Sequence, residues 1–252
     1  MIDLHEYFIT RRTVRSFDAS RVPDNALLES LLEEASHAPT TGNMQLYSVV
    51  ITRDPERHAA IAPAHFCQPA STDPGAVLLT FCADLNRFRR WCQLRDAETG
   101  FDNLQSLLAA IFDTVIFAQQ FNTAAEARGL GCCYLGTTTY NAAAIAEALE
   151  LPDLVVPVLT LAVGYPKGDT EVSDRLAPRA FVHNETYRRD SDADILSFFA
   201  EKEAREDSHR FVAENSKQTL AQVFTDVRYP KATSEAFSET FRAYLAAKGF
   251  TL

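Results

Sequence analysis

The residues best suited to bind a charged ligand lie near the N-terminus, in the run Arg11-Arg12-Thr13-Val14-Arg15. The run places three guanidinium groups and a hydroxyl within five positions, although the chain of 252 residues has a formal net charge of -10. A guanidinium binds phosphate oxygens through paired, charge-assisted hydrogen bonds. The run therefore indicates a site for a small phosphorylated ligand. The alternative is a solvated helix end, because arginines also favour the negative end of a helix dipole.

Composition limits the classes of protein that fit the chain. A hydrophobic content of 46% is enough for a large core. The acidic balance argues against a nucleic-acid partner, which requires a basic face. No run approaches eighteen apolar residues, and charges occur within the first six positions. We therefore expect neither a membrane span nor a secretory signal.

The cysteines and histidines indicate neither a disulfide framework nor a metal site. The five cysteines form an odd set without a Cys-x-x-Cys pair, so reduced thiols in the cytoplasm are expected. The adjacent pair Cys132-Cys133 is interpreted as two small buried residues at a strand, and the alternative is a redox device. The six histidines are scattered, and no metal is predicted.

Helical and extended patterns alternate along the chain and predict an α+β fold. Predicted helices end near Arg11, cover 24–36, start at 55 and cover 103–128 and 141–149, and predicted strands cover 46–52, 76–82, 132–135 and 156–163. The 103–128 segment is apolar on most faces and should run through the core. From about residue 188 the pattern changes to charged helices at 191–208, 214–224 and 233–248. We therefore expect one domain over 1–187 and a helical extension over 188–252.

Four blocks of residues follow one another in a recognisable order, whereas the glycine motifs of dinucleotide-binding and P-loop folds are absent. The blocks are the arginine run, the polar loop 39–45, the turn 134–137 and the late segment 175–178. In order and spacing they resemble the FMN-dependent nitroreductase family. The stretches 81–84 and 182–187 further resemble its group of oxygen-insensitive NADPH nitroreductases and NADPH–flavin reductases, which carry a C-terminal helical extension.

This resemblance implies a homodimer with two FMN sites at the subunit interface. Each subunit would have a nitroreductase-like mixed sheet packed between helices, and the C-terminal extension would pack on the domain or on the dimer partner. The implied cofactor contacts are Arg11, Arg12 and Thr13 at the phosphate and ribityl chain, Arg15 at the pyrimidine edge, Thr40 and Asn43 across the interface, Gln68 at the ring edge, Tyr134, Leu135, Gly136 and Thr137 near N5, and Arg175 at the phosphate. Ser173 stands where the family usually has a basic residue, which puts the strength of phosphate binding in question.

The resemblance also implies an activity. An NAD(P)H-dependent FMN oxidoreductase would pass two electrons, from NADPH in preference, to nitro compounds, quinones or flavins by a ping-pong mechanism. No side chain is assigned as a catalytic acid or base, because hydride chemistry belongs to the flavin. Two alternatives remain. One is a relative that acts on halogenated phenols or on the flavin itself, and the other is a non-catalytic FMN-binding protein, which Ser173 favours.

Several of these residues also have a purely structural interpretation. Tyr134 could be a core aromatic at a strand end. Asp113 lies inside an apolar helix and is interpreted as a paired structural carboxylate rather than a proton donor. Lys202 and Arg205 are candidates for the 2'-phosphate of NADPH, because the related group uses a basic residue in its extension. The alternative for both is a solvated charged face.

Overall fold

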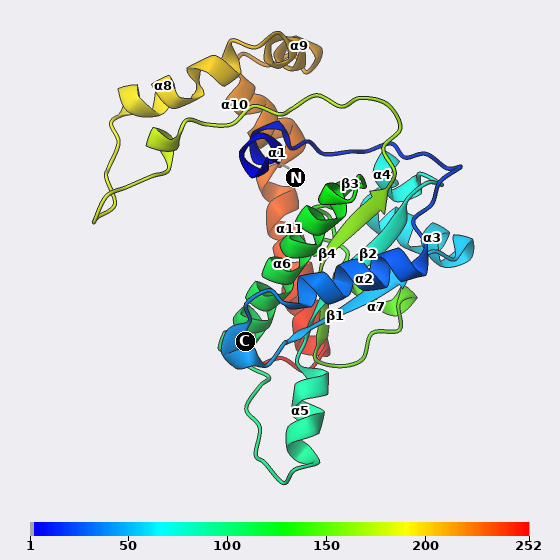
Figure 1. The fold of residues 1–252 in the computed structure, drawn as a ribbon. Helices are drawn as coiled ribbons and strands as arrows, with labels where there is room; N and C mark the ends of the chain where they lie inside the picture. The colour runs from blue at the N-terminus through cyan, green and yellow to red at the C-terminus, as the bar shows by residue number, and fades with distance from the viewer. Residues whose placement is uncertain (1–2, 252) are drawn as a thin grey trace. The chain divides into compact units, whose positions relative to one another are not determined.

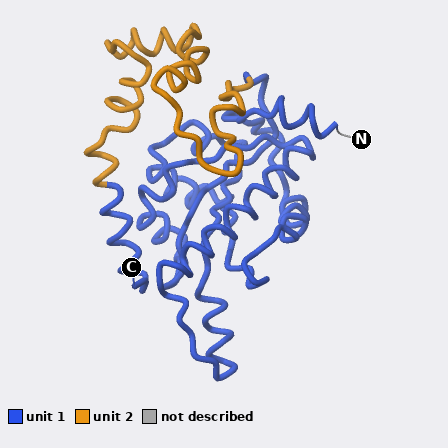
Figure 2. Tube along the Cα trace, turned by 90° about the vertical axis from the view of Figure 1, so that its left-hand side faces the viewer, with its two compact units in different colours: residues 1–171, 237–252 blue, residues 172–236 orange. Residues whose placement is uncertain are grey.

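The computed structural model describes residues 3–251 and divides into two compact units (Figure 2). We call residues 3–171 and 237–251 the core unit, and residues 172–236 the second unit. Helix α11 (Lys231–Ala247) begins in the second unit and ends in the core unit, where Tyr244 and Leu245 are buried. The boundary predicted at residue 187 therefore lies inside the second unit, and the end of the chain belongs to the core.

One four-stranded sheet forms the centre of the core unit. Its strands are β1 (Tyr47–Thr52), β2 (Val77–Asp84), β3 (Gly131–Leu135) and β4 (Val155–Gly164), in the order β1-β2-β4-β3. All three neighbouring pairs are antiparallel. The mixed sheet that the resemblance implies is therefore not found among the described residues, although the α+β class is confirmed. All eight residues of β2 are buried, as its continuous apolar run predicts.

Helices cover both faces of this sheet (Figure 1). On one face, α2 (Asn25–Ser36) and α6 (Leu104–Ala127) pack against alternate residues of the strands. The buried cluster there includes Leu31 of α2, Phe121 of α6 and Phe81 of β2. On the other face lie α3 (Pro55–Ile61), α7 (Ala142–Ala148) and the end of α11. Two faces with separate cores follow from the two-residue period of the strands.

The shorter elements include two helices that the sequence pattern did not reveal. In the core unit they are α1 (Leu4–Thr10), the unpredicted α4 (Pro69–Thr72) and α5 (Asn86–Gln93), and the 3-10 turns Thr41–Asn43 and Ala62–His65. The second unit has the 3-10 turn Pro178–Ala180, α8 (Asp192–Glu203), α9 (Glu206–Glu214), α10 (Leu220–Gln222) and the π-helical Val223–Arg228. The helix predicted over 191–208 is broken, because Arg205 has extended backbone angles. The helix predicted over 214–224 is wrong over residues 215–219, because α9 ends at Glu214 and α10 begins at Leu220.

Helix α6 matches its prediction closely. The Asn103 side chain caps it by accepting from the Ser106 N–H, and Gly129 follows it with φ +80°. By length and composition alone α6 could cross a membrane. In the structure its buried residues pack on the sheet. It also carries exposed apolar side chains at Leu104, Phe112, Val115 and Ile116.

The arginine run is held against the edge strand β3 by backbone pairing and by two glycines. The Val14 N–H donates to the Cys132 carbonyl at 3.1 Å, and Phe17 forms a bridge with Pro166. Val14 and Phe17 are buried above Gly131 and Gly164, which face each other across the β3–β4 pair. These glycines leave the space that the two apolar side chains fill.

Replacing Gly131 with alanine should destabilise the fold. The new Cβ would lie 2.6 Å from the Cβ and Cγ2 of Val14, which is closer than packed carbons approach. We expect a loss of about 1–3 kcal/mol in the free energy of unfolding, measured by urea titration. Adding Val14→Gly, which removes the Cβ as well as both Cγ atoms, should relieve the overlap, so the two losses should not add. Gly100→Ala, which meets nothing within 4 Å, is the control, and an equal effect from it would contradict the packing argument.

Candidate functional site

Because the arginine run packs on β3, it has one side buried in the core and one side exposed to solvent. Val14 and Phe17 point into the core and are buried, whereas Arg12 and Arg15 are exposed. The segment is extended after α1 ends at Thr10, and two consecutive exposed residues, Arg15 and Ser16, separate the buried Val14 from the buried Phe17. The structure thus presents guanidinium groups at the surface from a backbone that the sheet fixes.

Arg11 faces inward, toward the C-terminal end of α6. Its guanidinium lies 3.1 Å from Glu126 Oε1 and donates to Asn122 Oδ1 at 3.3 Å. The Tyr7 hydroxyl donates to Glu126 Oε2 at 2.6 Å, and burial together with this hydrogen bond raises the pKa of Tyr7. The Glu126 side chain is only 9% exposed, so Arg11 compensates a nearly buried carboxylate. The sequence showed the arginine but not this partner, and a phosphate contact of Arg11 stays a prediction.

Among residues 3–251, no carboxylate pairs with Arg12 or Arg15. Arg12 donates to the carbonyl of Thr170 at 3.2 Å. Arg15 makes no hydrogen bond or ion pair with any group of residues 3–251. A pocket of about 260 Å³ beside Arg12 is lined by residues that include Arg11, Glu126 and Gly131. In a chain of net charge -10, cations without a carboxylate partner mark a place for an external anion.

The end of β3 provides an ordered surface next to this run. Leu135 is buried, and the Thr138 hydroxyl stabilises the turn after it by donating a hydrogen bond to the Leu135 carbonyl at 2.9 Å. Tyr134 is partly buried against the α2–α6 core, its hydroxyl lies 3.4 Å from Gln119 Oε1, and burial raises its pKa. Tyr134 therefore does pack as a core aromatic, and its contact with a ligand stays a prediction.

The cysteines of β3 behave as small core residues. Cys132 and Cys133 are both buried, and burial raises the pKa of both thiols. A raised pKa leaves little thiolate, which is the reactive form. The interpretation of this pair as packing residues is supported. Among residues 3–251 no three histidine, cysteine or acidic side chains gather as metal ligands would.

A hydrogen-bonded cluster joins two more of the predicted ligand contacts. The Gln68 side-chain amide donates to Thr137 Oγ1 at 3.2 Å and to the His65 carbonyl at 3.1 Å. The His65 Nδ1 lies 3.0 Å from the same Thr137 oxygen. Sequence reasoning missed His65, because a lone histidine among Pro and Ala carries no signal of its burial.

The loop with Thr40 and Asn43 is fixed by a buried carboxylate of α6. Asp113 is 1% exposed, and its two oxygens accept from the backbone N–H groups of Thr41 at 2.7 Å and Leu46 at 3.3 Å. Asp113 is thus structural, as expected, although its partners are backbone amides rather than a cation. Buried carboxylates are stable when backbone donors satisfy them.

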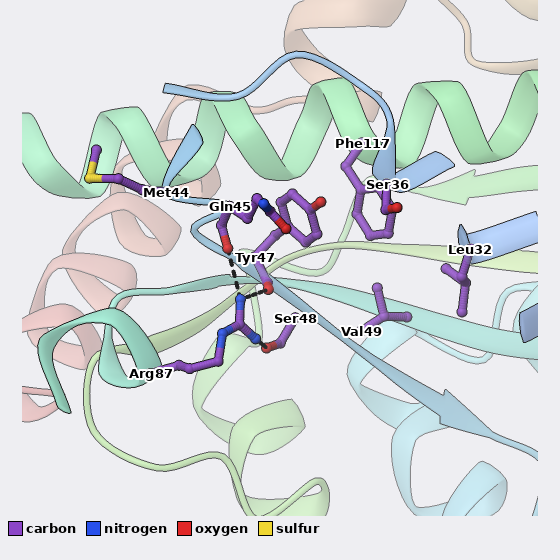
Figure 3. Close-up of a pocket in the computed structure, with 9 residues that line it drawn as sticks. All are labelled: Leu32, Ser36, Met44, Gln45, Tyr47, Ser48, Val49, Arg87 and Phe117. Atoms are coloured by element: carbon purple, nitrogen blue, oxygen red, sulfur yellow. Dashed lines mark hydrogen bonds between the residues drawn. The ribbon is translucent and has the colours of Figure 1, made fainter. Parts of the chain in front are cut away.

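Arg87 holds the other side of this loop, where β1 begins (Figure 3). Its guanidinium donates to the Gln45 carbonyl at 2.7 Å, the Tyr47 carbonyl at 2.9 Å and the Ser48 hydroxyl at 3.0 Å. The Tyr47 ring stacks on Phe117 of α6, with 4.1 Å between centroids. Arg87, Tyr47 and Phe117 are among the residues that line a pocket of about 550 Å³ along β1. The loop is therefore rigidly attached to the β1 edge of the sheet.

Within a single chain, the loop with Thr40 and Asn43 lies far from the arginine run. The loop is anchored at Asp113 and the run at Glu126, and thirteen residues of helix place these about 20 Å apart. The loop also adjoins the edge strand β1, while the run adjoins the opposite edge strand β3. Thr40 and Asn43 are therefore separated from Arg12 and Arg15 within the chain.

The second unit contains the remaining predicted contacts. Arg175 donates to the carbonyls of Ser173 at 3.3 Å and Asp174 at 2.7 Å. Lys202 forms an ion pair with Asp174 at 2.8 Å, and this hydrogen bond lowers the pKa of Asp174. Arg175, Arg179 and Lys202 line one pocket of about 230 Å³. Arg205 lies apart from that lining and pairs with Asp207 at 3.0 Å.

Comparisons with known proteins identify the family of the chain. The chain matches the nitroreductase family over residues 9–165. It is 29% identical to FMN reductase (NADPH) of Bacillus subtilis over 74% of this chain and 75% of that protein. It is 30% identical to the oxygen-insensitive NADPH nitroreductase of Salmonella typhimurium, over 73% of this chain and 74% of that protein. A solved structure from Bacteroides fragilis superposes with a TM-score of 0.95 at 46% identity and covers 98% of this chain and 100% of that one. The chain belongs to the nitroreductase family.

Proposed function

We propose that this NAD(P)H-dependent oxidoreductase binds FMN at the arginine run and passes two electrons from NADPH to nitro compounds, quinones or flavins. The observation that carries the proposal is the pair Arg12 and Arg15, two exposed guanidinium groups without a carboxylate partner among residues 3–251. They extend from a segment whose backbone is hydrogen-bonded to the sheet. Such fixed cations suit a dianionic phosphate and a ring edge that becomes negative.

The chemistry of the donor set fits FMN. Arg12, with Thr13 beside it, would bind the phosphate and ribityl chain, and Arg15 the pyrimidine edge. Gln68 offers its side-chain amide for the ring edge, and the turn 134–137 would lie near N5. Arg175 would complete the phosphate site.

When bound, FMN supplies the hydride and electron-transfer chemistry. The residues of this chain bind and orient it. Arg15 keeps a positive charge beside the edge where negative charge develops, and a cation fixed in advance needs no reorganisation at that moment. The donor and the acceptor would occupy the same open face in turn, which gives ping-pong kinetics. The five unpaired cysteines favour a reducing compartment such as the cytoplasm.

The site is proposed to be shared between two copies of the chain. Thr40 and Asn43 lie at the opposite edge of the sheet from the arginine run, so a second subunit would have to bring them to the cofactor. Helix α6 also presents the exposed apolar side chains Leu104, Phe112 and Ile116 on turns related by four or eight residues. An exposed apolar row of this length is typical of an oligomer interface.

Removal of a phosphate-binding arginine should weaken FMN binding. We expect Arg12→Ala and Arg175→Ala each to lose about 1.5–3 kcal/mol, roughly ten- to a hundredfold in affinity. Flavin fluorescence titration measures this, with Arg189→Ala, an exposed arginine elsewhere in the second unit, as the control. Equal affinity in all three variants would remove both arginines from the site. Flavin that binds but is not bleached by NADPH without oxygen would favour the non-catalytic alternative.

A charge placed in the exposed row of α6 should dissociate the dimer. Phe112 is 57% exposed in the single chain, and Phe112→Asp would bury a carboxylate if the row is an interface. Sedimentation velocity should show a dimer for the unaltered chain and a monomer with weaker FMN binding for the variant. Leu94→Asp changes an equally exposed residue outside α6 and should leave the dimer intact. A flavin-loaded monomer of the unaltered chain would contradict the shared site.

Discrimination between NADPH and NADH should depend on the second unit. Lys202 shares a pocket with Arg175, and Arg205 follows on the next helix. We expect Lys202→Ala with Arg205→Ala to lower the NADPH/NADH ratio of kcat/KM by about ten- to a hundredfold, since one or two cation–phosphate contacts are lost. Lys217→Ala, which also breaks an exposed ion pair, is the matched control. An unchanged ratio in the double variant would mean that the 2'-phosphate is bound elsewhere.

A further inference from the structure

His65 is a buried polar residue that has no role in the proposed contacts with FMN. It is 0% exposed and ends the 3-10 turn Ala62–His65. Its Nδ1 lies 3.0 Å from Thr137 Oγ1, while its Nε2 is buried and has no hydrogen-bond partner among the described residues. A leucine could fill the same space without a buried unpaired nitrogen. The imidazole therefore needs a reason other than packing.

The backbone after His65 folds back sharply. Phe66 has φ 55° and Cys67 φ 48°, the left-handed conformation that non-glycine residues seldom adopt even singly. Hydrogen bonds from these two N–H groups to the Pro63 and Ala62 carbonyls, both 2.9 Å, close the turn. The turn brings the Gln68 side chain to the carbonyl of His65 itself. Such strain persists where the surroundings fix the conformation.

The cluster determines which way the Gln68 amide points. A carbonyl oxygen only accepts hydrogen bonds, so the atom 3.1 Å from the His65 carbonyl must be the nitrogen of the amide. The second hydrogen of that nitrogen goes to Thr137 Oγ1 at 3.2 Å. Both donors are then used inside the protein, and Oε1 is the atom left for a ligand. An outward acceptor matches the imide N–H at the edge of a flavin ring.

His65 fixes the hydroxyl on which this orientation depends. Burial lowers the pKa of His65 to about 4, so the ring is neutral and binds through a hydrogen bond rather than as a cation. The hydroxyl of Thr137 can accept from Gln68 and still share a hydrogen bond with His65 Nδ1. The Asn141 side chain anchors the same segment from α7 by donating to the Ala64 carbonyl at 2.7 Å.

We propose that His65 is a positioning residue for the flavin: through Thr137 it orients the Gln68 amide so that Oε1 meets the ring imide N–H. The inference rests on the proposed function, because it takes bound FMN as the ligand. It assigns His65 no contact with the reacting atoms.

Flavin fluorescence titration of matched variants of the full chain tests this. His65→Leu keeps the volume but removes Nδ1, and FMN should bind about tenfold more weakly, the effect of one lost hydrogen bond. His65→Asn keeps a polar atom near Nδ1 and should restore most of the affinity. His58→Leu is the control, because His58 lies in the same region but bonds to the Ser71 carbonyl. Thr137→Val removes the linking hydroxyl without changing the shape and serves if His65→Leu does not fold.

The decisive measurement is the coupling with Gln68. Adding His65→Leu or Thr137→Val to Gln68→Ala should cause no further loss of affinity, because the only group they position is gone. A merely structural effect would add to the loss and would appear in His58→Leu as well. Full additivity, or unchanged affinity in both single variants, overturns the role of His65 while leaving the proposed function intact. Failure of the unaltered chain to bind FMN would overturn both.

Discussion

The docking of the arginine run onto the glycine pair of β3 and β4 is the contact on which the rest of the site depends. Gly131 and Gly164 lie opposite each other, and the absence of side chains there lets Val14 and Phe17 sit directly on the sheet. Apolar burial fixes the position of the run, and its pairing with Cys132 fixes the register. The surface cations are therefore a consequence of packing beneath them.

Helix α6 carries the second constraint, since two of its carboxylates, Asp113 and Glu126, each hold a different segment of the chain. Asp113 accepts hydrogen bonds from two backbone N–H groups of the loop before β1. Near the C-terminal end of the helix, Glu126 pairs with Arg11 and accepts a hydrogen bond from the Tyr7 hydroxyl. A carboxylate inside an apolar helix is unfavourable unless such partners are present. Because the helix is rigid, it also keeps the two loops about 20 Å apart. Thr40 and Asn43 thus lie at one edge of the sheet and the arginine run at the other, which is the arrangement that a two-fold pair of chains would complete.

Local signals in the sequence predicted most of the helices and strands. The contacts between residues far apart in the chain could not be predicted in this way. Asp24, Asp54 and Asn103 each cap the helix that their position predicted. The break at Arg205 and the short α5 were missed, because their apolar content is low and no glycine or proline marks them. For the site, the residue types of the run were predictable. The inward role of Arg11 was not, because Glu126 lies 115 residues away in the chain.

The partners of the cations separate the proposed cofactor contacts from the proposed donor contacts. Among the described residues Arg12 and Arg175 bond only to carbonyl oxygens, and Arg15 has no bonded partner. Lys202 and Arg205 each have a carboxylate. A phosphate that binds the first group displaces no anion, whereas one that binds Lys202 must replace or share Asp174. Competition with a carboxylate that is always present weakens binding and speeds release. A resident cofactor is served by the first arrangement, and a donor that must leave before the acceptor enters is served by the second.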